Sequence, residues 1–306
     1  MSAPVLLPPR PIDDPDLAPG AAPVARTNWQ LFRRRFFRHR LALVSIAVLA
    51  ILMVACYGAP WLAPYKQNAQ NLLDGGMGPS AKHWFGTDDL GRDQLSEIMY
   101  AGRISLTIGL VVALLSTVVG VAVGAVSGYF GGATDQALSG FTDLFLVLPD
   151  LALLAVAVVI FSRSFTSIIL VLAALGWMYM ARIVRAQVLS LKEKEFVEAA
   201  RASGASSMRI LLRHIIPNCV GTIMVNASLA VAVAISTEAA LSFLGVGIQA
   251  PQNSWGLMLT GAKSYTTSTS KFYLVLFPGL MLLLTVLAVN FIGDALRDAL
   301  DPQARH

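Results

Sequence analysis

Residues 182–218 read RIVRAQVLSLKEKEFVEAARASGASSMRILLRHIIPN, a charged stretch that lies between long apolar segments. It carries seven Lys and Arg and three Glu. Small residues between Phe196 and Ser203 suit a short helix, and Gly204 follows, where a left-handed turn costs little. The serines at 206–207 can cap a second helix with an apolar side, which Pro217 is expected to stop or kink. The pattern predicts a polar helix–turn–helix whose small side chains allow close approach.

The composition excludes an ordinary soluble domain. The chain has 306 residues, of which 56% are hydrophobic and 13% charged, and its mean hydropathy is +0.65. Several apolar runs exceed 18 residues, the length that spans a membrane as helix. The net charge of +5 does not indicate nucleic acid, because the basic residues lie beside the apolar runs. The two cysteines form neither a disulfide framework nor zinc-ligand spacing.

The N-terminal region divides into two parts. Residues 1–27 contain seven prolines without a periodic apolar pattern, which predicts a disordered cytoplasmic tail. Aromatic and basic residues alternate over 28–40, which predicts an amphipathic helix at an anionic membrane surface. A DNA-binding arm is disfavoured because an apolar span follows at once. Residues 41–301 are expected to form one six-span domain, and 302–306 a short tail.

Six apolar segments set the predicted topology. The spans are expected at about 41–63, 103–127, 138–161, 166–181, 219–244 and 272–292. The first is too long for a signal peptide and is read as an uncleaved anchor. Residues 64–102, 162–165 and 245–271 are then external, and 128–137 form a glycine-rich internal connection. Sixteen of the 23 Lys and Arg fall in the internal segments, which predicts that both termini and 182–218 are cytoplasmic.

A few residues inside the predicted spans are unusual there. Asp150 follows Pro149 near mid-membrane, where a charge is costly unless it faces protein or water, so it is a candidate for the translocation path. A kinked helix with a hydrogen-bonded carboxyl explains it equally well. Glu238 lies toward the outer side and either lines the same path or simply sits near the interface. The glycines spaced by four over 120–128 predict close helix packing in lipid.

No motif for catalysis is present. The chain lacks GxxxxGK[ST], HExxH, GxSxG and CxxC, so it is not expected to be an enzyme, and any transport by it against a gradient would need energy from a partner. His83 lies near several aspartates, but one histidine without ligand spacing does not predict a metal site. A capped loop with local ion pairs is the favoured interpretation of residues 83–93.

Two motifs resemble a known family. Glu198-Ala199-Ala200, Gly204 and Ile216-Pro217 resemble the EAA loop of ABC importer permeases, and residues 83–93 resemble that family's GTDxLGRD element. His214 stands where the general pattern has Ile, and Ile216-Pro217 where it has Leu-Pro. These departures resemble the peptide/nickel branch of the family. The resemblance extends from about Trp29 to Asp301.

The resemblance implies a type I ABC importer-like permease fold in a bacterial cytoplasmic membrane. It implies the "C" permease of a dipeptide/oligopeptide importer, which pairs with a homologous permease, two ATPases that bind ATP and Mg²⁺, and an extracellular solute-binding protein. This chain would bind no cofactor and no nucleic acid, but membrane lipid and peptide. The implied ATPase-coupling residues, in a loop at about 190–218, are Glu198, Ala199, Ala200, Arg201, Gly204, Arg209, Arg213, His214 and Pro217. A contact of the outer loop with the binding protein is also implied, at Asp88, Arg92 and Asp93.

Two alternatives stay open at this point. The same machinery would serve another small solute, such as a nickel chelate, glutathione or a haem-like compound. A stand-alone proton-coupled carrier would instead use Asp150 and Glu238 as proton sites, and dependence on ATP separates it from an importer. A membrane enzyme is disfavoured because the polar residues within the spans form no nucleophile–base set.

Overall fold

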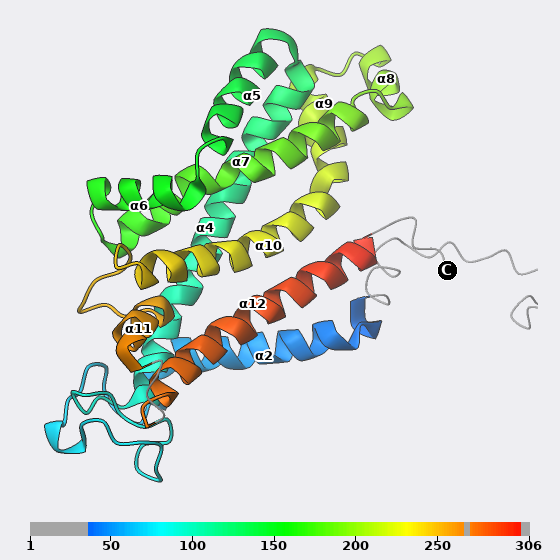
Figure 1. Cartoon of the computed structure of the whole chain (residues 1–306). Helices are drawn as coiled ribbons and strands as arrows, with labels where there is room; N and C mark the ends of the chain where they lie inside the picture. Colours follow the sequence, from blue (N-terminus) through cyan, green and yellow to red (C-terminus); the bar gives the residue numbers. More distant parts are fainter. Residues whose placement is uncertain (1–35, 266–269, 301–306) are drawn as a thin grey trace, which may run out of the picture.

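The computed structural model describes residues 36–265 and 270–300, and these ranges fold into helices joined by loops (Figure 1). Within these ranges five helices are long and apolar enough to cross a membrane, and a bent pair, taken as one broken span, makes six, which confirms the predicted all-α, six-span architecture. The elements are α2 (Arg40–Tyr57), α3 (Ala59–Leu62), η1 (Leu72–Asp74), α4 (Gln94–Phe130), α5 (Gly132–Leu146), α6 (Asp150–Phe161), α7 (Phe165–Leu191), α8 (Glu195–Ala202), α9 (Ser207–Ile210), η2 (Leu211–Ile215), α10 (Ile216–Phe243), α11 (Trp255–Gly261), η3 (Lys263–Tyr265) and α12 (Tyr273–Leu300).

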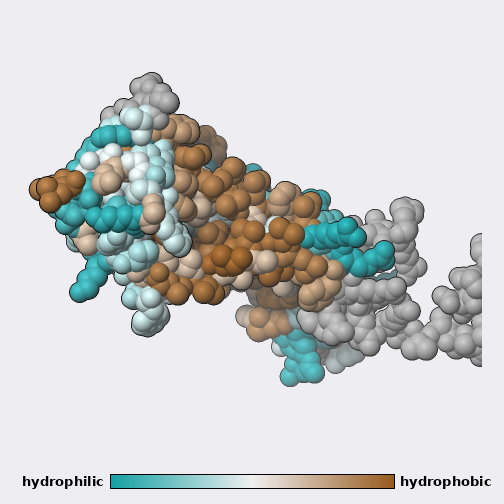
Figure 2. Space-filling model, turned by 90° about the horizontal axis from the view of Figure 1, so that it is seen from below, coloured by the Kyte–Doolittle hydropathy of each residue, from teal (hydrophilic) through white to brown (hydrophobic). Residues whose placement is uncertain are grey.

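The surface carries large apolar side chains between two polar ends, as the band in Figure 2 shows. On α2, Val44, Ile51 and Val54 are each at least 60% exposed. Such exposure is unfavourable in water but suits a hydrocarbon solvent, where the helices satisfy their own backbone groups. The polar outer loops form one end, and the charged α8 lies at the other (Figure 1).

Helix α4 is the centre of the bundle and packs against α2, α5, α7, α10, α11 and α12. Its closest partner is α7, because three glycines remove the side chains between them. A Cβ added at Gly120 would lie 2.6 Å from Met180 Cβ, and one at Gly124 would lie 2.3 Å from the Ala181 carbonyl oxygen. The predicted small-residue packing face is therefore confirmed.

Helix α4 begins earlier than the predicted span, because residues 94–102 of the segment predicted to be external are already helical. Asp93 caps the helix through the backbone N–H of Ser96, and Gln94 is its first residue. The 37 residues of α4 make it about 55 Å long. The hydrocarbon core is only about 30 Å thick, so the outer turns of α4 project beyond it.

The third span is broken, and the predicted glycine-rich connection at 128–137 is mostly helical. Helix α4 ends at Phe130, Gly131 adopts φ +67°, and α5 starts at once. Helices α5 and α6 then meet at 91° around residues 147–149. Pro149 lacks an N–H and disfavours a helical residue before it, which explains the elbow.

Three further boundaries differ from the sequence prediction. Helix α2 ends at Tyr57 because the chain turns at Gly58. Helix α7 continues to Leu191 rather than ending near 181, and α12 continues to Leu300 rather than ending near 292. Pro217 does not stop its helix, since residues 207–243 form one helical run. The π-helical segment η2 precedes this proline, and such wider turns accommodate a missing backbone donor.

Some of the predicted segments lie outside the residues that the structure describes. The Pro-rich tail 1–27 and the tail 302–306 lie outside the described residues, as does the amphipathic helix over 28–35. Residues 36–38 are helical, and the His39 side chain then caps α2.

The α4–α7 contact generates a stability prediction. Gly124→Ala should destabilise the purified protein by about 1–3 kcal/mol, because the new Cβ meets a backbone carbonyl that cannot yield. Gly140 on α5 is exposed and has no heavy atom within 4 Å of a built Cβ. The matched variant Gly140→Ala should therefore be neutral or stabilising by up to about 1 kcal/mol. Thermal unfolding in detergent measures both, and equal midpoints would show that α4 and α7 are not closely packed.

Candidate functional site

The coupling segment, residues 192–218, contains the short helix α8, which lies at one end of the bundle (Figure 1). Helix α8 ends in a Schellman turn: Gly204 N–H donates to Arg201 O at 3.0 Å, and Ala205 N–H donates to Ala200 O at 3.1 Å. Gly204 has φ +78°, which a glycine adopts without strain. Val197 is fully buried in an apolar cluster with Val184, Ile210 and Ile215. One face of α8 is thus anchored, and the other is free.

Most of the sequence-predicted coupling residues are exposed, some on α8 and its closing turn and the others on α9, η2 and the start of α10. Glu198, Ala199, Arg201, Gly204, Arg209, Arg213 and Pro217 are exposed, whereas Ala200 and His214 are half-buried. Within residues 36–265 and 270–300, the three arginines form no ion pair. Their guanidinium groups are therefore available to a carboxylate on another molecule.

A cavity of about 620 Å³ lies between α4, the α5–α6 elbow, α7 and α10. Its wall is largely apolar, with neutral polar groups from Ser116, Thr117, Tyr179, Asn226, Ser236 and Thr237. Asp150, the first residue of α6, also lines it and is exposed. The chain bends beside Asp150, as the kinked-helix alternative expects, but the carboxylate is exposed at the cavity, as the path alternative expects.

Glu238 does not line this cavity. Its side chain is fully buried, and its Oε1 accepts a hydrogen bond from Ser242 Oγ at 2.7 Å. Its Oε2 accepts from Ser105 Oγ at 3.4 Å, and that same Oγ accepts from Trp255 N–H at 3.2 Å. Glu238 therefore joins α4, α10 and α11, and its burial argues against the first of its two alternatives, a position that lines the path. The sequence did not reveal these contacts because Ser105 lies 133 residues from Glu238.

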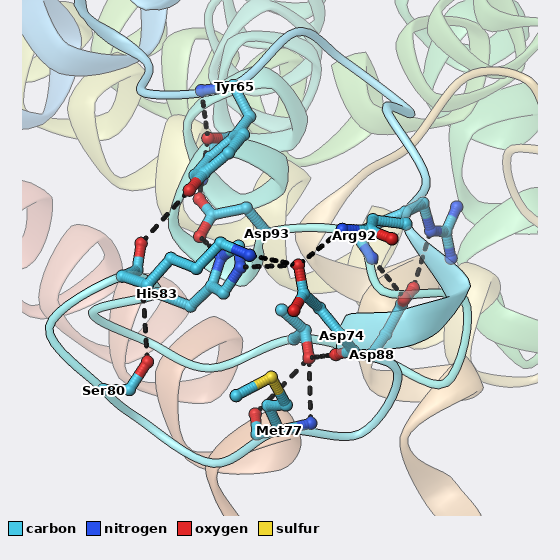
Figure 3. Close-up of polar contacts among 12 residues, drawn as sticks. Tyr65, Asp74, Met77, Ser80, His83, Asp88, Arg92 and Asp93 are labelled. Atoms are coloured by element: carbon cyan, nitrogen blue, oxygen red, sulfur yellow. Dashed lines mark hydrogen bonds and ion pairs between the residues drawn. The ribbon is translucent and has the colours of Figure 1, made fainter.

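The outer loop is organised around a buried histidine (Figure 3). His83 Nδ1 lies 2.9 Å from Asp93 Oδ1, and Asp93 Oδ2 accepts from Ser96 N–H and Oγ. On the other side, Lys82 Nζ donates to Asp74 at 2.5 Å and holds the pKa of that carboxyl below its ordinary value. The predicted capped loop with local ion pairs is confirmed. The described residues contain no group of three His, Cys, Asp or Glu that could hold a metal ion.

Of the three predicted outer contacts, the structure separates Asp93 from the other two. Asp93 is 4% exposed, so its carboxylate serves the fold and is not presented at the surface. Asp88 and Arg92 are paired at 2.6 Å and line an outer groove of about 490 Å³. Asp89 closes one side of that groove through contacts with Tyr265 and Lys271 from the second outer loop.

Two ion pairs tie α5 to α7 near the coupling segment. Arg185 donates to both carboxylate oxygens of Asp135, each at 2.6 Å, and Arg182 pairs with Asp143. The sequence gave no signal for the pair of Asp135 and Arg185, which lie 50 residues apart.

Comparison with known proteins places this chain among membrane components of transport systems. The family model described as the binding-protein-dependent transport system inner membrane component matches residues 120–306. A second model, the N-terminal TM domain of oligopeptide transport permease C, matches residues 27–79.

Individual relatives agree over most of their length. The chain is 42% identical to the oligopeptide transport system permease protein OppC of Haemophilus influenzae, over 92% of this chain and 90% of that protein. It is 40% identical to the dipeptide transport system permease protein DppC of Bacillus subtilis, over 89% and 85%. Its fold is similar to a chain of the inward-facing MetNI methionine ABC transporter, with a TM-score of 0.55 and 20% identity, over 67% of this chain and 96% of that one.

The burial of Glu238 predicts how its variants behave. Glu238→Ala should cost about 2–4 kcal/mol, because it leaves a void and removes the acceptor of buried serine hydroxyls. Glu238→Gln keeps an oxygen that can accept from Ser242 and should cost much less. Thermal unfolding of the two purified variants in detergent gives the comparison. Equal stability of both variants with the native protein would rule out a packing role.

Proposed function

Because the chain belongs to the family of binding-protein-dependent transport system inner membrane components, we propose that it is one permease subunit of an ATP-driven importer of di- and oligopeptides. It is a multi-pass protein of the bacterial inner membrane. The observation that carries the proposal is the exposed, glycine-turned helix α8 at the charged end of the spans. The peptide cargo is carried over from the relatives' names.

The chain is not itself the catalyst of the transport cycle. We assign ATP and Mg²⁺ binding and hydrolysis to two cytoplasmic ATPase partners, which dock on α8. Ala199 and Gly204 lack bulk and permit a close approach to the ATPase, while Glu198 and the exposed Arg201, Arg209 and Arg213 supply charges for ion pairs.

Movement of α8 would reach the spans through its buried anchor. Val197 packs with residues of α7 and with the start of the long run 207–243, so a displacement of α8 pulls on two spans together. The ion pairs of Arg182 and Arg185 extend that connection to α5 and hence to the elbow beside the cavity. A partner drives such a change only if it binds the two states with different affinity.

The cavity beside the elbow is our choice for this chain's half of the translocation path. A homologous second permease would supply the other half, and a solute-binding protein would deliver peptide at the outer end. The groove lined by Asp88 and Arg92 lies at that end and is open to such a partner.

A stand-alone proton carrier receives less support from these positions. That alternative requires Asp150 and Glu238 to act along one path, but only Asp150 lines the cavity. Uptake that continues in vesicles without ATP and without ATPases would nevertheless establish it.

The coupling turn provides the direct test. Gly204→Val should reduce ATP-dependent peptide uptake at least about tenfold, because a β-branched residue at positive φ strains the turn that ends α8. Uptake is measured in cells or in proteoliposomes that contain the complete transporter. No heavy atom lies within 4 Å of a Cβ built at this site, so loss of space is not a competing explanation.

The matched control is Gly204→Asn, because asparagine tolerates the left-handed conformation and should retain most of the uptake. Membrane insertion of both variants is checked by immunoblotting. Pull-downs of the tagged chain should lose the ATPases in a Glu198→Arg/Gly204→Val variant and keep the second permease. Normal uptake by Gly204→Val would contradict the proposed coupling role.

A further inference from the structure

The wall of the central cavity contains one formal charge. Of the residues that line it in the described part of the chain, Asp150 is the only Asp, Glu, Lys, Arg or His. Asp150 is exposed, and residues 36–265 and 270–300 provide it with no ion pair. The other acidic residue within the spans that the sequence singled out, Glu238, is buried and hydrogen-bonded, so the two carboxylates have different roles.

The bend between α5 and α6 fixes the position of this carboxylate. The chain bends by 91° between α5 and α6, and Asp150 is the first residue after the bend, with Pro149 before it. An acidic side chain in the first turn of a helix is favoured by the helix dipole. Pro149 is sufficient to produce the bend, so the bend itself does not require a carboxylate at position 150.

An unpaired carboxylate beside apolar walls attracts a cation. Charges inside the spans are costly unless they face water or a counter-charge. The apolar walls lower the local dielectric, so attraction between Asp150 and a cation is stronger there than in bulk water. Because the cavity itself supplies no cation, a ligand is the natural source.

Neutral hydrogen-bond acceptors share the cavity with Asp150. Asn226 Nδ2 donates to Thr222 O at 2.8 Å, which leaves the amide oxygen as the free end of that side chain. Thr117 Oγ1 is buried, and no described residue pairs with it. An ammonium group has three donors and no acceptor, and therefore suits a wall of this kind.

We propose that Asp150 binds the α-ammonium group of the cargo peptide while the peptide is in this cavity. This inference rests on the proposed import function. A cavity of about 620 Å³ is within the range of small-ligand sites and suits a short peptide, whose apolar side chains would contact the leucines and valines of the wall. The chemical class of ligand is thus a zwitterionic or cationic peptide with a free amino terminus.

The test uses the complete transporter in lipid nanodiscs with a reporter cysteine, Thr237→Cys, in the cavity wall. Both native cysteines are buried and should not react with a charged thiol reagent. Bound peptide should slow the labelling of the Thr237→Cys reporter. The concentration of trialanine that halves the labelling rate should be about tenfold lower than that of N-acetyl-trialanine, because loss of a hydrogen bond to a charged group commonly weakens binding by about tenfold. The solute-binding protein is omitted, so its own selectivity does not enter.

Three further variants make the result specific. In the Asp150→Asn variant the two peptides should protect the reporter cysteine equally. The Asp150→Glu variant keeps a carboxylate and should keep the preference for the peptide with a free amine. Asp298→Asn changes an exposed carboxylate on α12 outside the cavity wall and should keep the preference.

Equal protection by the two peptides in the native background would overturn the assignment, as would protection by neither of them while ATP-dependent uptake is intact. A native complex without any ATP-dependent peptide uptake would instead reject the import function on which the inference rests.

Discussion

The close contact between α4 and α7 is the constraint on which the rest of the structure depends. In lipid, apolar side chains gain nothing by leaving their solvent, so helices associate through tight packing and polar contacts. The glycines of α4 bring the backbone of α7 within reach, and Arg185 then binds Asp135 through both carboxylate oxygens. A side chain at Gly124 would separate the two helices and move every element attached to them.

Both ends of the molecule are built outward from this pair. On the coupling side, α7 carries the cluster that anchors Val197, so α8 is fixed on one face and exposed on the other. On the outer side, Asp93 starts α4 and binds His83, and the buried Glu238 connects α4 to α10 and α11. A protein that must transmit movement between its two ends requires such stiff connections, with freedom confined to surfaces that partners bind.

The central cavity arises from the one span that is not straight. Pro149 turns the chain by 91° and leaves a hollow beside α4, α7 and α10. The same bend places the carboxylate of Asp150 in an apolar wall where no described side chain neutralises it. Packing thus explains the hollow, and electrostatics explains why a peptide with a positive terminus is a suitable occupant.

The sequence by itself determined the class of the protein, the number of its spans and the helix–turn–helix from 195 to 215, because hydrophobic length, charge asymmetry and the left-handed Gly204 are properties of neighbouring residues. It also identified Pro149 as a bend and the glycines at 120–128 as a packing face. Only the tertiary structure decided that Pro217 lies within a continuous helix, that Asp93 is buried, and that Glu238 joins helices while Asp150 lines a cavity. Those outcomes depend on which distant groups meet: a carboxylate within a span has the same local pattern whether a serine 133 residues away or an open cavity lies beside it.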